Sequence, residues 1–284
     1  MNKISVIIAV YNRSDILLKA LMSIQAQSLK PFEVVLSDDG SDEDIIAAVS
    51  AHKEKFDFGI VHVFQPDRGF RLAKARNNAI RKAEGDFLVF WDQDVLATRR
   101  YLETYARYFR PDEFLIPPDP VRLSEEQTAA VTEDMIVSCN FSALVTGEQI
   151  RALRRRVYKD RYYRWETRFL KRRGYKPKVR GGILGISKKA LLLLDGYDEN
   201  YQGWGAEDDD LGRRLYRAGI RGRNVFLHEY SLHLWHPTNK EAEKSLNLDY
   251  YNKRLAEIRR GDIKAVRGLS NPLGEDEIKV TRIK

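Results

Sequence analysis

The chain has 284 residues, with 49 lysines and arginines against 41 acidic residues and a formal net charge of +8. A hydrophobic content of 43% excludes a wholly disordered chain, and 18 glycines with 9 prolines exclude a fibrous one. Cys139 is the only cysteine, so an internal disulfide and a cysteine metal cluster are excluded, and a reducing, cytoplasmic setting is expected. The apolar run from Ile4 to Val10 is too short to span a membrane.

The first 120 residues alternate short apolar runs with helical patterns. Strands are predicted at 4–10, 33–37, 59–64 and 87–91, and helices at 15–27, 42–55 (opened by a Ser41 cap) and 72–83. Alternating strands and helices are typical of an α/β sandwich with a mostly parallel central sheet, which is the predicted fold class. Ligands of such sheets bind beyond the carboxyl ends of the strands.

The rest of the chain is less regular. Helices are predicted at 124–132, 151–173, 188–194 and 207–218, and strands at 136–144 and 225–227. The tail is predicted to be helical from Lys240 to Arg259 and irregular after that.

Two pairs of aspartates follow predicted strands. Asp92 and Asp94 come directly after the strand 87–91, where two carboxylates can share a hard cation such as Mg²⁺ or Mn²⁺. The alternative is a polar turn with a helix cap. Asp38 and Asp39 follow the strand 33–37, and Gly40 suits a turn there. A turn and a cap do not account for both aspartates, and a carboxylate here can accept an N–H from a base ring.

Arginines precede and occupy the helix 72–83. Arg71 stands just before this helix, and Arg76 lies within it. Guanidinium groups at a helix N-terminus suit a phosphate, because their charge adds to the helix dipole. The alternative is a solvated basic face.

An acidic run opens the predicted helix 207–218, and two histidines follow it. The run can be an ordinary acidic first turn, which the helix dipole favours. That reading leaves Trp204, bracketed by Gly203 and Gly205, unexplained. A flat aromatic beside a carboxylate suits a sugar, and the carboxylate can take a proton from an attacking hydroxyl. His233 and His236 lie three apart, and imidazole is a good ligand for a metal such as Mn²⁺ where carboxylates converge on it.

The order of these motifs resembles that of a family 2 glycosyltransferase with the GT-A fold. The matching stretches are Ser5–Arg13, Asp38–Ser41, Ala75–Asn77, Gly85-Asp86 and Asp92–Asp94. The later stretches Gly196–Glu199 and Gly203–Leu211 look like the carboxyl half of β-1,4-galactosyltransferases and of bacterial chondroitin-type polymerases. The resemblance implies a GT-A domain over 1–240, with a nucleotide-binding half at 1–120, an acceptor and catalytic half at 121–240 that includes the basic helix 151–173, and a C-terminal extension at 241–284.

The resemblance also implies residue roles. Asp39, with Asp38 nearby, would contact uracil, Arg71 and Arg76 would serve the nucleotide side, and Asp92 would approach the ribose and the metal. Asp94 would bind Mn²⁺ or Mg²⁺ and His236 would complete that site. His233 stands where the galactosyltransferases have a methionine, which leaves open whether one or both histidines bind metal. Asp208 would be the catalytic base, Glu207 would assist acceptor binding, and Trp204 and Gly205 would contact the acceptor or sugar.

The reaction implied is a metal-dependent, inverting transfer of a hexose or N-acetylhexosamine from a UDP-sugar to a glycan or lipid-linked acceptor, in cell-surface polysaccharide synthesis. One alternative is a sugar-1-phosphate nucleotidyltransferase, which would show a glycine-rich basic loop where this chain has Tyr11-Asn12-Arg13. Another is a non-catalytic module that binds a glycan or nucleic acid, which has no need of a metal site and a base together.

The positive charge is concentrated in one segment. Residues 151–173 carry eleven lysines and arginines against two acids, a net charge of +9, which leaves −1 for the rest of the chain. Four aromatics, Tyr158, Tyr162, Trp165 and Phe169, recur there at helical spacing. They can face the core, or the segment can bind an anionic acceptor or the inner face of an anionic membrane as a peripheral contact. No nucleic-acid-binding motif supports nucleic acid as the partner.

Overall fold

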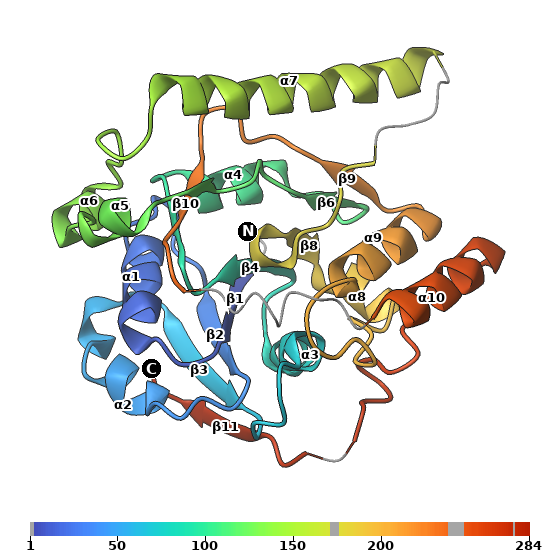
Figure 1. The fold of residues 1–284 in the computed structure, drawn as a ribbon, viewed down its shortest axis with the longest axis horizontal. Coiled ribbons are helices and arrows are strands. Elements are labelled where there is room, and N and C mark those ends of the chain that lie inside the picture. Colours follow the sequence, from blue (N-terminus) through green and yellow to red (C-terminus); the bar gives the residue numbers. More distant parts are fainter. Residues whose placement is uncertain (1–2, 171–175, 238–246, 275) are drawn as a thin grey trace.

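The computed structural model describes residues 3–170, 176–237, 247–274 and 276–284. An eight-stranded sheet forms the centre of the molecule, in the order β11-β3-β2-β1-β4-β8-β6-β9 (Figure 1). Its strands are β1 (Ile4–Val10), β2 (Glu33–Asp38), β3 (Gly59–Phe64), β4 (Phe87–Asp92), β6 (Glu113–Leu115), β8 (Gly185–Ser187), β9 (Arg221–Arg223) and β11 (Lys279–Arg282). The four neighbours β3, β2, β1 and β4 run parallel. The predicted α/β class with a mostly parallel central sheet is confirmed.

Helices cover both faces of this sheet. One face packs against α1 (Ser14–Gln25), α2 (Ile45–Ser50) and α4 (Tyr101–Tyr108), and the other against α3 (Leu72–Lys82), α8 (Lys188–Leu193) and α9 (Glu207–Arg217). The remaining helices are α5 (Glu125–Ala129), α6 (Glu133–Ser138), α7 (Gly147–Leu170) and α10 (Leu248–Arg260), with 3-10 turns at Lys53–Lys55 and Gly181–Ile183. Among the described residues, no helix combines the length and apolar character needed to cross a membrane.

A second, three-stranded sheet brings the late part of the chain beside the early part. It consists of β5 (Val95–Ala97), β10 (Ser231–His233) and β7 (Val121–Arg122), in the order β5-β10-β7. β10 pairs antiparallel with β5, so that His233 stands opposite Val95. A separate apolar cluster joins residues of this sheet to residues of α1 and α6. The register therefore fixes a late histidine next to the turn that follows β4.

The central strands are mostly apolar because both of their faces are buried. Residues 4–10 of β1 are buried almost throughout, and successive side chains enter the two opposite core layers. The parallel register places Val10 opposite Asp38 and Ala9 opposite Asp92. The aspartates after β2 and those at the end of β4 consequently meet at one edge of the sheet.

Several local predictions were wrong, mostly for reasons of capping. The predicted helix 42–55 is only Ile45–Ser50. It begins late because the Asp44 carboxylate caps it by accepting the Ala47 N–H, and Lys53–Lys55 forms a separate 3-10 turn. Ser41 is not that cap: its Oγ accepts the Asn12 N–H. The predicted strand 136–144 begins inside α6, whose first turn is capped by Thr132. The short strand expected at 225–227 lies instead at 221–223, paired with β6.

The tail is not irregular after Arg259. Its end forms β11, which pairs antiparallel with β3 at the sheet edge (Figure 1). Just before β11, the Asp276 carboxylate contacts Arg71 at 2.6 Å, Lys74 at 2.7 Å and the exposed Arg68 at 3.2 Å. The side chains of Arg71, Lys74 and Asp276 are 8%, 5% and 1% exposed. The tail thus neutralises two buried cations at the start of α3.

We predict that Asp276→Asn destabilises the fold by about 3 kcal/mol, because it leaves two buried cations without their carboxylate. Arg68→Gln, which removes the exposed partner, should cost less than about 1 kcal/mol. Urea unfolding of the three proteins measures both values.

The destabilisation caused by Asp276→Asn has a defined pH dependence. Burial alone would raise the pKa of Asp276, but its bonds to Lys74 and Arg71 outweigh burial and lower that pKa. The stabilisation is therefore complete above the unfolded pKa of about 3.9 and is lost only as the pH falls through the lower folded value. The difference in the free energy of unfolding between the unaltered protein and Asp276→Asn should stay constant between neutral and mildly acidic pH. A difference that shrinks in this range would contradict the assignment.

Candidate active site

The turn after β4 is held in place by three hydrogen bonds. The Trp91 indole donates to the Val95 carbonyl at 2.7 Å, which closes the turn over residues 92–94. Gln93 accepts the Tyr11 N–H at 2.9 Å and donates to the Asn12 carbonyl at 3.3 Å, which ties this turn to the loop after β1. The side chains of residues 92 and 94 therefore start from a fixed backbone.

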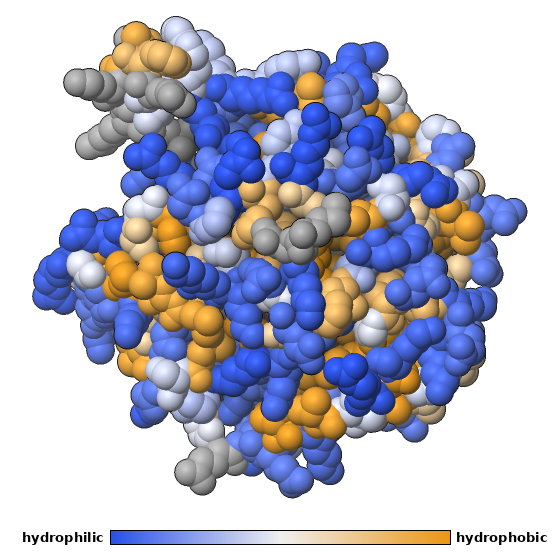
Figure 2. Space-filling model, turned by 180° about the vertical axis from the view of Figure 1, so that it is seen from behind, coloured by the Kyte–Doolittle hydropathy of each residue, from blue (hydrophilic) through white to orange (hydrophobic). Residues whose placement is uncertain are grey.

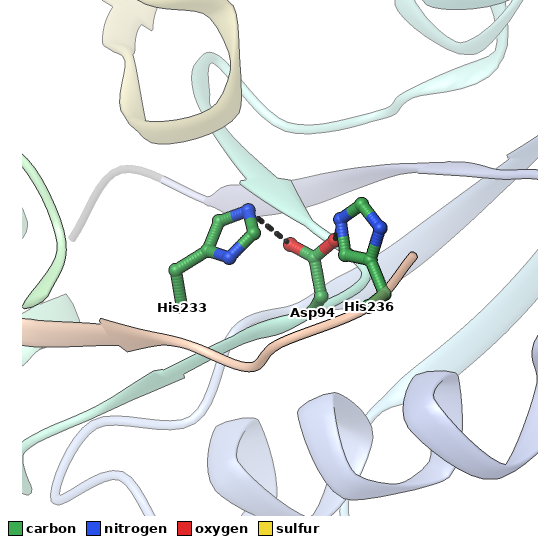
Figure 3. Close-up of side chains that lie close together, drawn as sticks. All are labelled: Asp94, His233 and His236. Atoms are coloured by element: carbon green, nitrogen blue, oxygen red, sulfur yellow. Dashed lines mark ion pairs between the residues drawn. The ribbon is translucent and has the colours of Figure 1, made fainter. Parts of the chain in front are cut away.

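Asp94, His233 and His236 converge on one point (Figure 3). The His236 Nε2 lies 3.1 Å from one carboxylate oxygen of Asp94, and the His233 Nε2 lies 3.5 Å from the other. One ligand atom from each residue fits within a group less than 4.8 Å across. The Leu234 N–H donates to the Asp94 carbonyl at 2.8 Å, so the backbone itself holds the two segments together.

This trio fits a divalent cation. Asp94 is 5% exposed, and its Oδ1 is buried without a hydrogen-bond partner among the described residues, as expected of an atom that awaits a ligand. The Nδ1 of His236 lies 3.0 Å from the Pro237 carbonyl, which orients the ring so that Nε2 faces the carboxylate. Two imidazole nitrogens and a carboxylate oxygen suit a transition-metal cation such as Mn²⁺ better than they suit Mg²⁺, which prefers oxygen ligands.

The charges of the trio favour an ionised carboxylate. Burial alone would raise the pKa of Asp94, but the hydrogen bond from His236 and the nearby His233 and Arg13 outweigh burial and lower it. The hydrogen bond with Asp94 raises the pKa of His236, whereas burial lowers the pKa of His233. The Arg13 guanidinium stands 3.5 Å from Asp94 and supplies further positive charge.

Asp92 stands apart from the trio and faces another segment. A Cβ added at Gly182 would lie 1.8 Å from an Asp92 carboxylate oxygen, so the chain approaches this carboxylate as closely as glycine permits. Burial and the neighbouring Asp94 raise the pKa of Asp92 to about 7.

Asp208 lies in the first turn of α9, beside the same glycine segment. Its Oδ2 accepts the Gly181 N–H at 2.8 Å, and its Oδ1 accepts from the Arg76 guanidinium at 3.1 Å. The Asp208 side chain remains 28% exposed, so it is fixed but open to a ligand. Glu207 is more buried, and its carboxylate lies 3.6 Å from Arg76. Burial and the neighbouring Asp208 raise the pKa of Glu207 to about 7.

Arg76 connects the two groups of carboxylates. Its side chain is 4% exposed, and it reaches from α3 to the start of α9. Burial alone would lower the pKa of Arg76, but Asp208, Glu207 and Asp92 raise it, so this guanidinium stays charged. The structure therefore places Arg76 among the acids.

The loop before α9 has a backbone that favours glycine. Gly203, Gly205 and Ala206 all have positive φ, at 72°, 92° and 77°. The Asn247 side chain donates to the Gly205 carbonyl at 2.9 Å, and Trp204 projects with 53% of its surface exposed. The predicted sugar-contacting Trp204 thus stands exposed on a fixed turn next to Asp208.

The predicted nucleotide side is assembled around Asp39. Its carboxylate accepts the Arg71 N–H at 2.7 Å and the Gln65 amide at 2.5 Å, and burial raises its pKa. Asp38 lies behind it, bonded to the Ser41 N–H at 2.8 Å and to His62 at 2.9 Å. The Arg71 guanidinium points to Asp276, so only its backbone touches Asp39.

Sequence reasoning missed three contributors to this site. Arg13 supports Asp94, and Gly181 with Gly182 brings the backbone against Asp208 and Asp92. The adjacent glycine pair was a usable signal, because such pairs mark close backbone approach. No local pattern marked Arg13, because its contact with Asp94 forms only when the two segments fold together.

A cavity of about 560 Å³ opens beside these groups. Asp92, Gly182 and His233 line one side, and Arg156 of α7 and Arg180 line another. The cavity is large enough for part of a sugar nucleotide or an acceptor.

Comparison with known proteins identifies the family of this chain. The family model described as glycosyl transferase family 2 matches residues 5–173, more than half of the chain, and the chain belongs to this family. The model described as the N-terminal domain of galactosyltransferase matches residues 163–237. The family match favours a glycosyltransferase over the nucleotidyltransferase and the non-catalytic module.

One curated relative and two solved structures illustrate the similarity. Chondroitin synthase from Pasteurella multocida is 26% identical over 90% of this chain, but the chain spans only 28% of that relative's length. The Pyrobaculum calidifontis mannosyltransferase PcManGT, solved with GDP-Man and Mn²⁺, has a TM-score of 0.60 at 17% identity, covering 91% of this chain and 64% of that one. S. aureus TarS, residues 1–349, solved with UDP-GlcNAc, has a TM-score of 0.58 at 18% identity, covering 94% of this chain and 68% of that one. Both structures share the GT-A fold.

We predict that Mn²⁺ raises the melting temperature of the protein and that Asp94→Asn abolishes this rise, because it removes the carboxylate charge at the centre of the trio. Differential scanning fluorimetry with and without EDTA measures the effect. His52→Asn, a histidine on the far side of the fold, is the matched control and should respond like the unaltered protein. An equal Mn²⁺ response in Asp94→Asn would show that the cation binds elsewhere.

Proposed function

We propose that this protein is a metal-dependent, inverting glycosyltransferase that moves a hexose or N-acetylhexosamine from a UDP-sugar to a glycan or lipid-linked acceptor. The proposal rests mainly on one observation: a candidate metal site and a candidate base lie at the same edge of the sheet. The trio Asp94, His233 and His236, whose geometry suits a metal, lies on the same side as an open carboxylate, Asp208, which is fixed by Arg76 and by Gly181. Synthesis of a cell-surface polysaccharide is the setting that the similarity to chondroitin synthase supports.

The donor nucleotide would lie between β2 and the turn after β4. Asp39 can accept an N–H of uracil, and Tyr11, 45% exposed beside the same loop, offers a ring to stack on the base. Asp92 ends β4, opposite Ala9 of β1, and would approach the ribose. TarS was solved with UDP-GlcNAc, which supports a uridine donor, whereas PcManGT was solved with GDP-Man. The choice of nucleotide therefore needs a direct test.

A cation held by Asp94, His233 and His236 would neutralise the diphosphate as it leaves. The chain's own residues account for the other half of the reaction. Asp208 accepts the proton of the acceptor hydroxyl while that oxygen bonds to the anomeric carbon and the bond to the diphosphate breaks. Attack from the face opposite the leaving group inverts the anomeric centre. Arg76 orients the Asp208 carboxylate, and Glu207 and Trp204 lie where an acceptor would be bound.

We predict that UDP binds with Mn²⁺ present and loses most of its affinity in EDTA, because the diphosphate needs the cation to reach the acidic edge. Isothermal titration calorimetry measures both states, with GDP as the control nucleotide. Binding of neither nucleotide would contradict the proposed function. Preferential binding of GDP would be consistent with a glycosyltransferase but would contradict a UDP-sugar as the donor.

We also predict that Asp208→Asn lowers the transfer rate on the order of 10²–10⁴-fold while UDP still binds, because general-base assistance has that magnitude. The matched control is Asp209→Asn. Asp209 is the next carboxylate in the same helical turn, has the same 28% exposure and pairs with Arg213 instead of Arg76. Loss of UDP binding in Asp208→Asn, or an equal loss of rate in Asp209→Asn, would contradict the assigned base.

A further inference from the structure

The helix α7 has two faces with different surroundings. It runs along the top of the molecule and its carboxyl end extends past the sheet (Figure 1). The face toward the body buries Val157 and Asp160, and the Asp160 carboxylate accepts the Asn224 N–H at 3.1 Å. Earlier on the same helix, Leu153 and Arg156 line the cavity beside Asp92. The body side of α7 is therefore accounted for by packing and by the candidate active site.

The opposite face carries a stripe of exposed aromatic side chains. Tyr158, Tyr162, Trp165 and Phe169 are 56%, 56%, 51% and 62% exposed. At 100° per residue they fall within an arc of about 60° on the helix surface. Ring centroids lie 6.3 Å apart for Tyr162 and Trp165 and 5.8 Å apart for Trp165 and Phe169. The alternative that these aromatics face the core is wrong.

Exposed basic side chains flank this stripe. Arg151, Arg154, Arg155 and Arg161 all lie on the aromatic side of the helix and are exposed. Residues 171–173 of the predicted basic segment fall outside the described part of the chain. The segment Gly147–Leu170 contains eight lysines and arginines and three acidic residues. The surface is thus cationic at its flanks and aromatic along its centre.

A further exposed apolar side chain lies at the carboxyl end of α7. Figure 2 shows orange atoms on the projection at the upper left, where this end of α7 stands away from the body. Leu170 there is 50% exposed. A contiguous aromatic and apolar surface in water signals an interaction site. A partner that binds this surface must offer negative charge and an apolar layer together.

We propose that this face of α7, the aromatic stripe with its flanking arginines, docks on the surface of an anionic phospholipid bilayer. Lipid phosphates meet the arginines, and the boundary between headgroups and acyl chains accepts Trp, Tyr and Phe side chains. A nucleic acid offers the phosphates without an apolar layer along their length. The charge and the aromatic stripe together therefore favour a bilayer.

Docking would orient the proposed active site. The helix that meets the bilayer also lines the cavity beside Asp92, so the cavity lies about one helix diameter, ~10 Å, from the headgroups. An acceptor attached to a lipid would then present its sugar at the cavity. This consequence rests on the proposed glycosyltransferase function, whereas docking itself does not.

Co-sedimentation of the full chain with vesicles tests docking. We expect binding to vesicles of phosphatidylglycerol and phosphatidylcholine, weaker binding at high salt, and little binding to phosphatidylcholine alone. The triple variant Arg154→Gln/Arg155→Gln/Arg161→Gln should lose affinity on the order of 100-fold, because each cation near the surface contributes about 1 kcal/mol. The double variant Trp165→Ala/Phe169→Ala should lose about tenfold through the apolar area it no longer buries.

Matched controls test whether vesicle binding depends on this surface or on any exposed cation or apolar side chain of the protein. Lys253→Gln/Arg259→Gln/Arg260→Gln removes three exposed cations from α10, and Leu192→Ala/Leu193→Ala removes two exposed apolar side chains from α8. Both should bind vesicles like the unaltered protein. Equal losses in controls and α7 variants would overturn the proposal, as would the absence of vesicle binding at low salt.

Two further measurements keep the outcome decisive. UDP binding with Mn²⁺ should be unchanged in both α7 variants, which distinguishes a failure of docking from a failure of the active site. The size of the protein in solution should be the same in all variants. A dimer that the Trp165→Ala/Phe169→Ala change dissociates would overturn the proposal in favour of a second copy of the chain. Equally tight binding of a DNA oligonucleotide that competes with vesicles would overturn it in favour of nucleic acid.

Discussion

The repulsion among carboxylates at one edge of the sheet is the constraint that shapes the site. Asp92 and Asp94 at the end of β4 and just after it meet Glu207 and Asp208 at the start of α9. Asp94 and Glu207 are buried, and Asp92 and Asp208 are partly buried. Buried like charges are costly unless cations or protons compensate them. Arg76 compensates Asp208 and Glu207, and the histidines with Arg13 compensate Asp94, while the pKa values of Asp92 and Glu207 rise to about 7.

The supporting structure serves this arrangement from distant parts of the chain. Arg76 is presented by α3, whose start is held by Asp39 and, through Arg71, by Asp276 in the tail. The acids of the stretch Gly196–Glu199, which marks the resemblance to galactosyltransferases, have structural roles. Asp198 accepts bonds from Tyr250 and the Val266 N–H, and Glu199 from Asn77. These residues fasten the segment after α10 against the domain.

Much of this could be predicted from the sequence, for identifiable reasons. The parallel core was predictable because β1 and β4 are mostly apolar, and the acidic turns were predictable because they follow β2 and β4. The order of the motifs indicated the family. The pairing of Asp94 with Arg13, the role of Gly182 and the ion pairs of Asp276 depend on contacts between segments far apart in the chain, which no local pattern encodes. The aromatic stripe of α7 was visible, but its exposure was not, because the same spacing also suits a buried face.

The most direct test of the account is the location of the metal. A crystal of the full chain soaked with UDP and Mn²⁺, measured at the manganese absorption edge, gives an anomalous peak wherever the cation binds. The account predicts one peak within ligating distance of Asp94, His233 and His236, with the diphosphate beside it and the Asp208 carboxylate facing the place of the donor sugar. A peak away from these three residues, or a diphosphate bound on the far side of Arg76, would contradict it.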